Sequence, residues 1–214
     1  MRITKFGHCC LLIEEGGLRI LTDPGFFTTA QNEVKQVDVL LITHEHTDHF
    51  HIESVKEILK KNQPKIITNS AVKALLVKEG IVENIQVVED GQSYQVGEVT
   101  FIGHGNKHAV IHAELPIVQN TGYFIGPRLF YPGDALYDPK KPIDILALPV
   151  AAPWLKISEA IDYALALAPK SVFPVHDGVL NEKVSDLPKH IAGSILEKHG
   201  IRYLNLEIGK ETEI

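Results

Sequence analysis

A short apolar run that leads directly into a cluster of histidines constrains the fold most strongly. Residues 39–42 are four consecutive aliphatic residues, Val-Leu-Leu-Ile. A run of this kind, without polar alternation, is typical of a β-strand that is buried on both faces. The segment at residues 44–49 follows almost at once and has the sequence His-Glu-His-Thr-Asp-His. The cluster is therefore expected in a turn just past the C-terminal end of a buried strand.

The rest of the chain alternates between short strand patterns and helical patterns. Apolar runs and period-2 segments predict strands at 9–13, 18–22, 65–68, 85–88, 99–102, 122–125, 129–131, 143–148, 171–175 and 201–204. Apolar residues at helical spacing predict helices at 52–61, 71–78 and 157–168, and a last helix from Ser185 or Asp186 to Gly200. Gly16 and Gly17 predict a hairpin between the first two strands. The chain is thus expected to be an α/β protein.

Composition and charge narrow the class of protein. The 214 residues are 44% hydrophobic and 22% charged, as in an ordinary globular chain, and we expect one domain that spans residues 1–214. The net charge is −6, and no run of Lys or Arg occurs. Both features disfavour nucleic acid and lipid surfaces as partners.

No segment has the features of a membrane span or an export signal. The longest uncharged apolar run, at 145–155, has 11 residues and contains two prolines, whereas a membrane helix needs about 20. The two cysteines, Cys9 and Cys10, are adjacent in the chain and too close for an ordinary disulfide. We therefore expect reduced thiols in a cytoplasmic protein.

The cluster at 44–49 has the side chains of a metal site. Three imidazoles and one carboxylate within six residues suit zinc, manganese or iron; a surface turn with incidental histidines is the alternative. In a loop, the first two histidines would face one ion and the Asp-His pair a second one. Asp134 and His176 also follow predicted strands. Each alone is explained by a turn or a core position, but together these residues are expected to converge at one sheet edge.

Five segments, in this order, resemble the motifs of the metallo-β-lactamase superfamily: Asp23, His44–His49, a later histidine, Asp134 and His176. The match extends from residue 3 to about residue 180. Three further stretches, Phe-Gly-His at 6–8, Leu-Thr-Asp-Pro-Gly at 21–25 and Pro-Val-Ala-Ala-Pro-Trp at 149–154, resemble the small hydrolases of its ascorbate-6-phosphate-lactonase-like branch. The resemblance implies a four-layer αβ/βα sandwich, with two mixed sheets face to face, helices on the outer faces and a dinuclear metal site along one edge.

The resemblance also implies which residues would hold two metal ions. One ion would be held by His44, His46 and a third histidine, the other by Asp48, His49 and His176, and Asp134 would bridge the two. Three histidines lie where the family supplies the third one: His104, His108 and His112. We choose His108, because it follows the strand at 99–102 after a short Gly-rich loop and precedes a small residue. His104 and His112 stay open as alternatives.

Other residues resemble positions that surround the site without holding metal. His8 and Asp23 are two of them, and a carboxylate at such a position fixes the tautomer of a ligating imidazole, although local hydrogen bonds in the hairpin explain both residues equally well. The loops expected to border the site also carry aromatic or cationic side chains, for which substrate contact and ordinary packing are both open: Phe26, Phe27, Tyr137, Trp154 and Lys156.

The resemblance implies a metal-dependent hydrolase. Two divalent ions, zinc by preference and manganese or iron as alternatives, would lower the pKa of a shared water to about 7. The resulting bridging hydroxide would attack an ester, lactone, amide or phosphoester of a small molecule, and Asp48 would orient it and handle its proton. An iron-dependent redox protein on the same scaffold is one alternative, disfavoured because His46 stands where diiron relatives usually have glutamate; a non-catalytic metal-binding module is another. A small-molecule substrate is the expected partner, and a homo-oligomer is left open.

Overall fold

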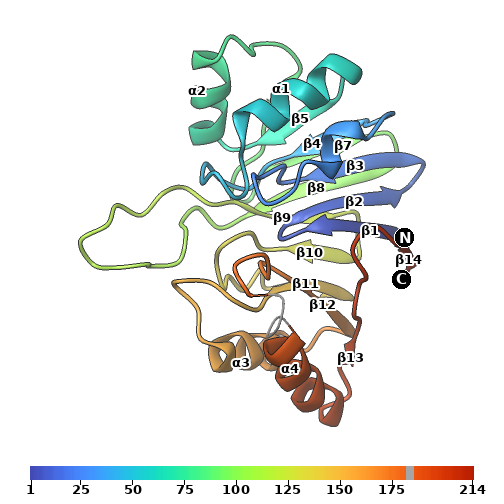
Figure 1. Ribbon diagram of the computed structural model, residues 1–214, viewed down its shortest axis with the longest axis vertical. Helices are drawn as coiled ribbons and strands as arrows, with labels where there is room; N and C mark the ends of the chain where they lie inside the picture. Colours follow the sequence, from blue (N-terminus) through green and yellow to red (C-terminus); the bar gives the residue numbers. More distant parts are fainter. Residues whose placement is uncertain (182–185) are drawn as a thin grey trace.

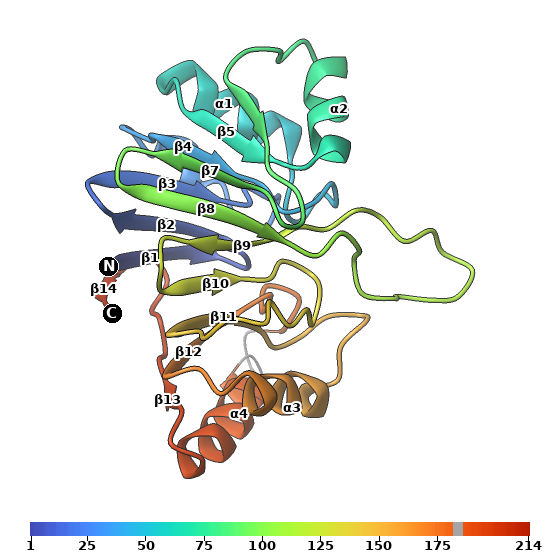
Figure 2. The same cartoon turned by 180° about the vertical axis from the view of Figure 1, so that it is seen from behind.

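Two β-sheets lie face to face and are covered by helices on their outer sides. The computed structural model describes residues 1–181 and 186–214. Helices α1 (Ile52–Lys61) and α2 (Ser70–Lys78) cover one sheet, and α3 (Ile157–Leu167) and α4 (Asp186–Lys198) cover the other (Figures 1 and 2). The order of layers is helix, sheet, sheet, helix, which confirms the predicted αβ/βα sandwich.

Each sheet has seven strands and is mixed. The first sheet has the order β14 (Glu211–Glu213), β1 (Arg2–Gly7), β2 (Cys10–Glu15), β3 (Leu18–Thr22), β4 (Val39–Leu41), β5 (Lys65–Thr68) and β6 (Ile85–Val87). The second has the order β13 (Arg202–Tyr203), β12 (Ser171–Val175), β11 (Ile145–Pro149), β10 (Leu129–Tyr131), β9 (Gly122–Ile125), β8 (Val99–His104) and β7 (Ser93–Val96). Pairing is parallel from β3 to β6 and from β10 to β13, and antiparallel elsewhere.

Strand β4 shows why its sequence is apolar throughout. Val39 and Leu41 belong to the core between the two sheets, whereas Leu40 packs into the layer under α1 and α2. All three side chains are fully buried. Because successive side chains of a strand point to opposite faces, a strand with a layer on each side has no position for a polar residue.

The helices bury apolar side chains against the outer faces of the two sheets. Val55 and Ile58 of α1 are buried against the first sheet, and Ala160 and Ala164 of α3 against the second. The small alanines let α3 approach the sheet closely. The helical spacing in the sequence therefore predicted both helices to within a residue or two of their ends.

The hairpin at the start of the chain is confirmed. β2 and β3 pair with Ile13 opposite Ile20, and the two residues between them, Gly16 and Gly17, have φ of 55° and 76°. Positive φ at both central residues is what a two-residue hairpin turn requires. Several predicted bounds shift by one or two residues; for example, β11 begins at Ile145 and not at residue 143, β8 continues to His104, and β2 spans Cys10–Glu15 and not 9–13. Ser185, one of the two predicted starts of the last helix, lies outside the described residues.

The connection between β8 and β9, residues 105–121, projects from the sandwich on the side opposite the two chain ends (Figures 1 and 2). A short 3-10 helix, η1 (Ala30–Glu33), follows β3. Among residues 1–181 and 186–214, no helix combines the length and apolar character needed to cross a membrane.

Candidate metal centre

The candidate site is built from segments that each follow the C-terminal end of a strand. His44–His49 follow β4, His108 follows β8, Asp134 follows β10 and His176 follows β12. The two sheets are tied together at this edge, because Thr121 donates its backbone N–H to the carbonyl of Thr43 at 3.0 Å. Polar side chains that are far apart in the sequence thus converge at one edge of the sandwich, as the sequence predicted.

The structure brings the predicted residues into two groups with metal-ligand spacing. His44, His46 and His108 form one group, in which the candidate ligand atoms all lie within 4.8 Å of one another. Asp48, His49 and His176, together with His8, form the second group by the same criterion. The division of the cluster between two groups matches the one implied by the family resemblance, with His8 as an addition.

The Asp134 carboxylate lies between the two groups. Its Oδ2 is 3.2 Å from Nε2 of His108 and 2.9 Å from Nε2 of His176, and its Oδ1 is 3.1 Å from Nε2 of His49. One carboxylate therefore reaches imidazoles of both groups, as a ligand shared by two ions about 3.5 to 4 Å apart would.

Hydrogen bonds fix the tautomers of four imidazoles. Nδ1 of His108 lies 2.6 Å from the carbonyl of Ala109, and Nδ1 of His176 lies 2.6 Å from the carbonyl of Ala151. A carbonyl only accepts, so Nδ1 carries the proton in both rings. Nδ1 of His49 similarly faces a carboxylate oxygen of Asp23 at 2.7 Å.

The tautomer of the fourth imidazole, His44, is fixed indirectly, through the hydroxyl of Thr43. The Thr43 hydroxyl donates to Oδ2 of Asp23 at 2.7 Å, so it accepts from Nδ1 of His44 at 3.0 Å. In all four rings the Nε2 lone pair is left facing the site, which is the arrangement in which metal-ligating histidines are held by their outer partners.

The Nε2 atoms of His44, His49 and His176 are buried and have no hydrogen-bond partner. The last two lie near Asp134 without hydrogen-bond directionality. Buried polar atoms are rarely left unpaired. Three unpaired Nε2 atoms, two of them beside the Asp134 carboxylate and the third in the group with His46 and His108, fit divalent metal ions. Imidazole with carboxylate is a donor set typical of zinc, manganese and iron.

Asp23 positions several residues of the site through buried hydrogen bonds. Its carboxylate is fully buried and accepts hydrogen bonds from the backbone N–H and the hydroxyl of Thr43, from the Tyr131 hydroxyl at 2.8 Å and from His49. The interpretation of Asp23 as a local hairpin residue is therefore too narrow, because its partners come from β10 and from the histidine turn.

His8 has the opposite tautomer. Its Nδ1 accepts the backbone N–H of Gly178 at 3.1 Å, so the ring proton lies on Nε2, which donates to Oδ2 of Asp48 at 3.2 Å. A neutral His8 thus has no lone pair to offer a metal from Nε2. It orients Asp48 and holds its charge, since the hydrogen bond from His8 keeps the pKa of that carboxyl below its usual value despite burial.

Without a metal ion, the His49 ring lies between the carboxylates of Asp23 and Asp134, which favour its protonated form. Burial opposes protonation of His49, but the Asp134 and Asp23 carboxylates raise its pKa well above the ordinary value. Despite its own burial, Asp134 has its pKa held well below the usual range by His49 and its other imidazole neighbours. A metal cation would replace this proton, because metal binding and protonation compete for the same lone pair.

Burial of His8 makes the metal-free protein sensitive to acid. Burial lowers the pKa of His8 from 6.5 to about 4, even though Asp48 favours the protonated ring. Between these two values the unfolded chain binds more protons than the folded one, so the free energy of unfolding falls as the pH decreases through this window. We expect His8 to contribute a loss of about 2 to 3 kcal/mol between pH 7 and pH 4.5.

The measurement is urea unfolding of the metal-free protein at both pH values, compared with His8→Asn. Asparagine does not titrate and tolerates the positive φ of 51° at this position. Burial also lowers the pKa of His44 and His46, so the variant should keep part of the pH dependence. An identical pH dependence in both proteins would contradict the role of His8.

The three candidates for the third histidine are separated by their surroundings. His108 lies in the group with His44 and His46. His104, the last residue of β8, packs edge-on against Phe124 with ring centroids 5.5 Å apart. His112 is exposed on the projecting connection, where its Nδ1 accepts a backbone N–H. The geometry therefore favours His108, and the other two lie outside both groups.

Two further side chains lie close to the candidate ligands, and the sequence led us to expect only Trp154 at the border of the site. The Cys9 sulfur lies within 4.8 Å of ligand atoms of His49 and Asp134; burial raises the pKa of this thiol to about 11, so it stays neutral, unlike a ligating thiolate. Trp154 donates its indole N–H to Oδ2 of Asp134 at 3.0 Å. The loop position of Trp154 and the family-like stretch at 149–154 were the signals for it, whereas no signal existed for Cys9.

Two glycines allow the close approaches that position the loops carrying the candidate ligands. A Cβ at Gly133, where φ is 63°, would lie 2.3 Å from Oδ1 of Asn120, the atom that accepts the backbone N–H of Asp134 at 3.0 Å. A Cβ at Gly25 would lie 1.7 Å from the carbonyl oxygen of Asp48. Glycine is thus required where the loops after β10 and β3 approach their neighbours.

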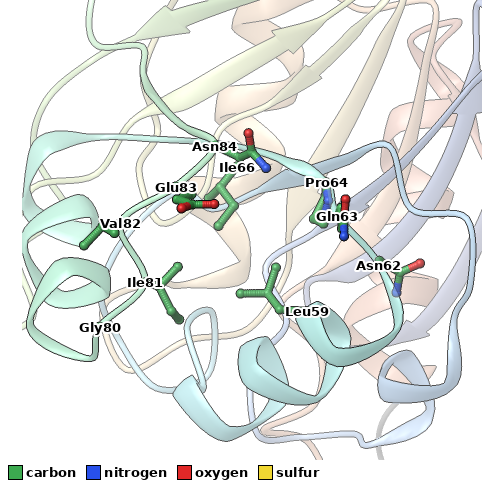
Figure 3. A pocket seen from close by; sticks show the side chains of 10 residues that line it. All are labelled: Leu59, Asn62, Gln63, Pro64, Ile66, Gly80, Ile81, Val82, Glu83 and Asn84. Atoms are coloured by element: carbon green, nitrogen blue, oxygen red, sulfur yellow. The ribbon is translucent and has the colours of Figure 1, made fainter.

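A cavity of about 370 Å³ opens at the site and is lined by His46, Thr47, Asp48, His108, Ile111, Asp134, Pro153, Trp154 and His176. A second cavity, of about 380 Å³, lies at the ends of α1 and α2, where Leu59, Ile66 and Ile81 point toward its middle (Figure 3). Its only ionisable lining residue is Glu83. Of these two cavities, the one beside the histidines contains the candidate metal ligands.

Comparison with known proteins agrees with this geometry. A family model described as a beta-lactamase superfamily domain matches residues 2–176. Protein Rv0786c of Mycobacterium tuberculosis is 38% identical over 185 residues, which cover 84% of this chain and 85% of that protein. A UPF0173 metal-dependent hydrolase of Koribacter versatilis is 29% identical over 216 residues, with 89% and 91% covered.

Among solved structures, the fold is similar to that of CmlA, a diiron beta-hydroxylase from Streptomyces venezuelae. The TM-score is 0.78 at 15% identity, and the match covers 100% of this chain and 54% of that one. At this identity the likeness concerns the fold alone.

Proposed function

Since the chain belongs to the metallo-β-lactamase superfamily and is a metal-dependent hydrolase like its named relatives, we propose that it binds two divalent ions, zinc by preference, and hydrolyses an ester, lactone, amide or phosphoester of a small molecule. The first ion would be held by His44, His46 and His108, and the second by Asp48, His49 and His176. Asp134 would be shared between them.

One observation carries the proposal: the four Nδ1–H groups are engaged by acceptors, and the buried Nε2 atoms of His44, His49 and His176 are left without partners. Each such unpaired group costs about 1 to 3 kcal/mol in the folded state. Unpaired Nε2 atoms in both groups, two of them beside the Asp134 carboxylate, support a site that holds cations.

When bound, two divalent ions supply a hydroxide at neutral pH and polarise the oxygen that gains charge in hydrolysis. The chain's own contribution is to hold the reacting groups. Asp48 is 22% exposed at the cavity, and the His8 N–H holds its Oδ2, so the remaining carboxylate oxygen is available to orient a nucleophile and receive its proton.

The test uses the full chain after chelation and dialysis. Metal content is measured by elemental analysis, and hydrolysis is followed with an ester, a lactone and a phosphodiester before and after addition of zinc, manganese or iron. We expect no turnover without metal, recovery with two ions per chain, and loss of metal in His46→Ala. His112→Ala, an exposed histidine outside both groups, should keep metal content and turnover.

Undiminished hydrolysis in the metal-free protein would contradict the proposal. An absorption spectrum of the protein as purified separates zinc, which is colourless, from an iron site that performs redox chemistry. Metal binding without turnover of any substrate class would instead indicate a non-catalytic binding module.

A further inference from the structure

We propose that the site takes substrates whose group next to the scissile bond is neutral and apolar, an aliphatic or aromatic acyl chain. This inference rests on the proposed hydrolase function and specifies its substrate class. Two apolar surfaces, here called walls, carry it: the first lines the cavity, and the second packs on His8 and the histidine turn.

The first wall is formed by Ile111, Pro153 and Trp154, which line the cavity together with the candidate ligands. The Trp154 ring stands edge-on to His108 and to His176, at centroid distances of 5.8 Å and 6.0 Å, so it spans both groups. Its only polar atom is already used by Asp134. What Trp154 offers to a substrate is therefore apolar ring surface.

The second wall is a stack of rings that leads from the surface to Asp48. Phe26 and Phe27 stack with centroids 4.6 Å apart, and Phe27 stacks on His8 at 4.4 Å. The two phenylalanines are 50% and 37% exposed. His8 in turn holds Asp48, a residue of the cavity lining.

The backbone that carries these rings is held against the histidine turn. The backbone N–H of Phe26 donates to the carbonyl of Thr47 at 3.1 Å, and the close approach of Gly25 to Asp48 fixes the loop against the histidine turn. Adjacent apolar side chains that stay exposed beside a candidate site mark a surface that a ligand covers.

The charged side chains at the cavity also favour a neutral substrate group. Within the described part of the chain, the lining holds two carboxylates, Asp48 and Asp134, and neither Lys nor Arg. Apart from the proposed metal ions themselves, a phosphate or carboxylate on the substrate would find no cationic partner among these residues. An acyl chain that extends away from the ions therefore gains most from apolar contact with the walls.

The test compares esters of one leaving group on the metal-loaded full chain: p-nitrophenyl acetate, p-nitrophenyl octanoate and the mono-p-nitrophenyl ester of suberic acid. The last two have acyl chains of equal length and differ in one terminal charge. Each methylene that becomes buried should raise kcat/KM about fourfold. We expect octanoate to exceed acetate by at least about tenfold, and the suberate ester to fall well below octanoate.

Variants connect the preference to the two walls. Ile111→Ala and Phe26→Ala should each lower the octanoate-to-acetate ratio, by about threefold to tenfold for the side-chain surface removed. Val82→Ala, which shortens an exposed aliphatic side chain at the second cavity, should leave the ratio unchanged. Equal rates for the three esters, or a ratio that neither wall variant changes, would overturn the proposal.

A binding measurement separates this inference from the hydrolase function. Trp154 is the only tryptophan of the chain, so its fluorescence reports on the site directly. Octanoate should bind the metal-loaded protein at least about tenfold more tightly than suberate, and Phe26→Ala should reduce that difference. If octanoate binds more tightly but no ester is hydrolysed, the hydrolase function is wrong and the apolar site is supported. If esters are hydrolysed but octanoate and suberate bind equally, the hydrolase function is supported and the apolar site is wrong.

Discussion

Replacement of Asp134 by asparagine is expected to lower metal-dependent hydrolysis at least about 100-fold and to weaken metal binding by more. Loss of an outer-shell partner alone costs about 10- to 100-fold, and Asp134 faces His49, His108 and His176 directly at 2.9 to 3.2 Å. The amide keeps the size of the side chain but removes its negative charge. Isothermal titration with zinc and turnover at saturating metal measure the two effects.

Thermal unfolding adds an independent measure of the same change. At metal concentrations about 1,000 times the dissociation constant, binding should stabilise the native chain by about 4 kcal/mol, which corresponds to a rise in Tm of roughly 8 to 16 °C for a chain of this size. Asp134→Asn should lose most of this rise. Asp138→Asn, which changes an exposed carboxylate paired with Lys140, is the matched control; equal metal binding in the two variants would show that Asp134 does not hold metal.

Replacement of Lys5 by methionine is expected to lower the free energy of unfolding by about 3 kcal/mol. Lys5 is 1% exposed and donates to the carboxylate of Asp177 and to the carbonyl of Pro174, both at 2.8 Å. Methionine fills the space but leaves both acceptors without this donor, and breaking a buried ion pair from one side typically costs about 3 to 5 kcal/mol. The lower end applies because Lys189 still contacts Asp177 at 2.9 Å.

Urea unfolding of the metal-free protein measures this loss without a contribution from ions. Lys60→Met is the control, because Lys60 forms its ion pair with Glu57 on the exposed side of α1, and exposed pairs contribute about 0 to 1 kcal/mol. A loss below about 1 kcal/mol for Lys5→Met would mean that the pair does not stabilise the junction between β1 and the loop after β12.

The sequence predicted strands that are buried on both faces better than strands at the edges. β4 and β12 have uninterrupted apolar or small residues because each has a layer on both sides. β7 and β14 alternate between exposed and half-buried side chains, and β1 contains the buried Lys5. β14 forms because β1, at the other end of the chain, offers it a free edge, which no local pattern reveals. β7 and β1 pair with their neighbours in the sequence, β8 and β2, but neither has an uninterrupted apolar run.

The candidate site was likewise predictable from local sequence only in part. The turn at His44–His49 is local, so residue types and spacing were sufficient to predict a metal site there. The choice of His108 depends on which of three histidines the fold buries beside the turn, and it rested on a resemblance. The role of His8 depends on a backbone N–H of Gly178, and no signal near His8 in the sequence could indicate which nitrogen carries its proton.

The contacts of Lys5 with Asp177 and of His8 with Gly178 have a consequence for the order of events during synthesis. His8 and Gly178 are 170 residues apart, a stretch that a ribosome takes roughly 10 to 30 s to produce. Throughout that interval the nascent chain presents the histidine turn without His176 and without the hydrogen bond that orients His8. The second candidate group, which includes His176, can therefore assemble only after this late part of the chain has been synthesised.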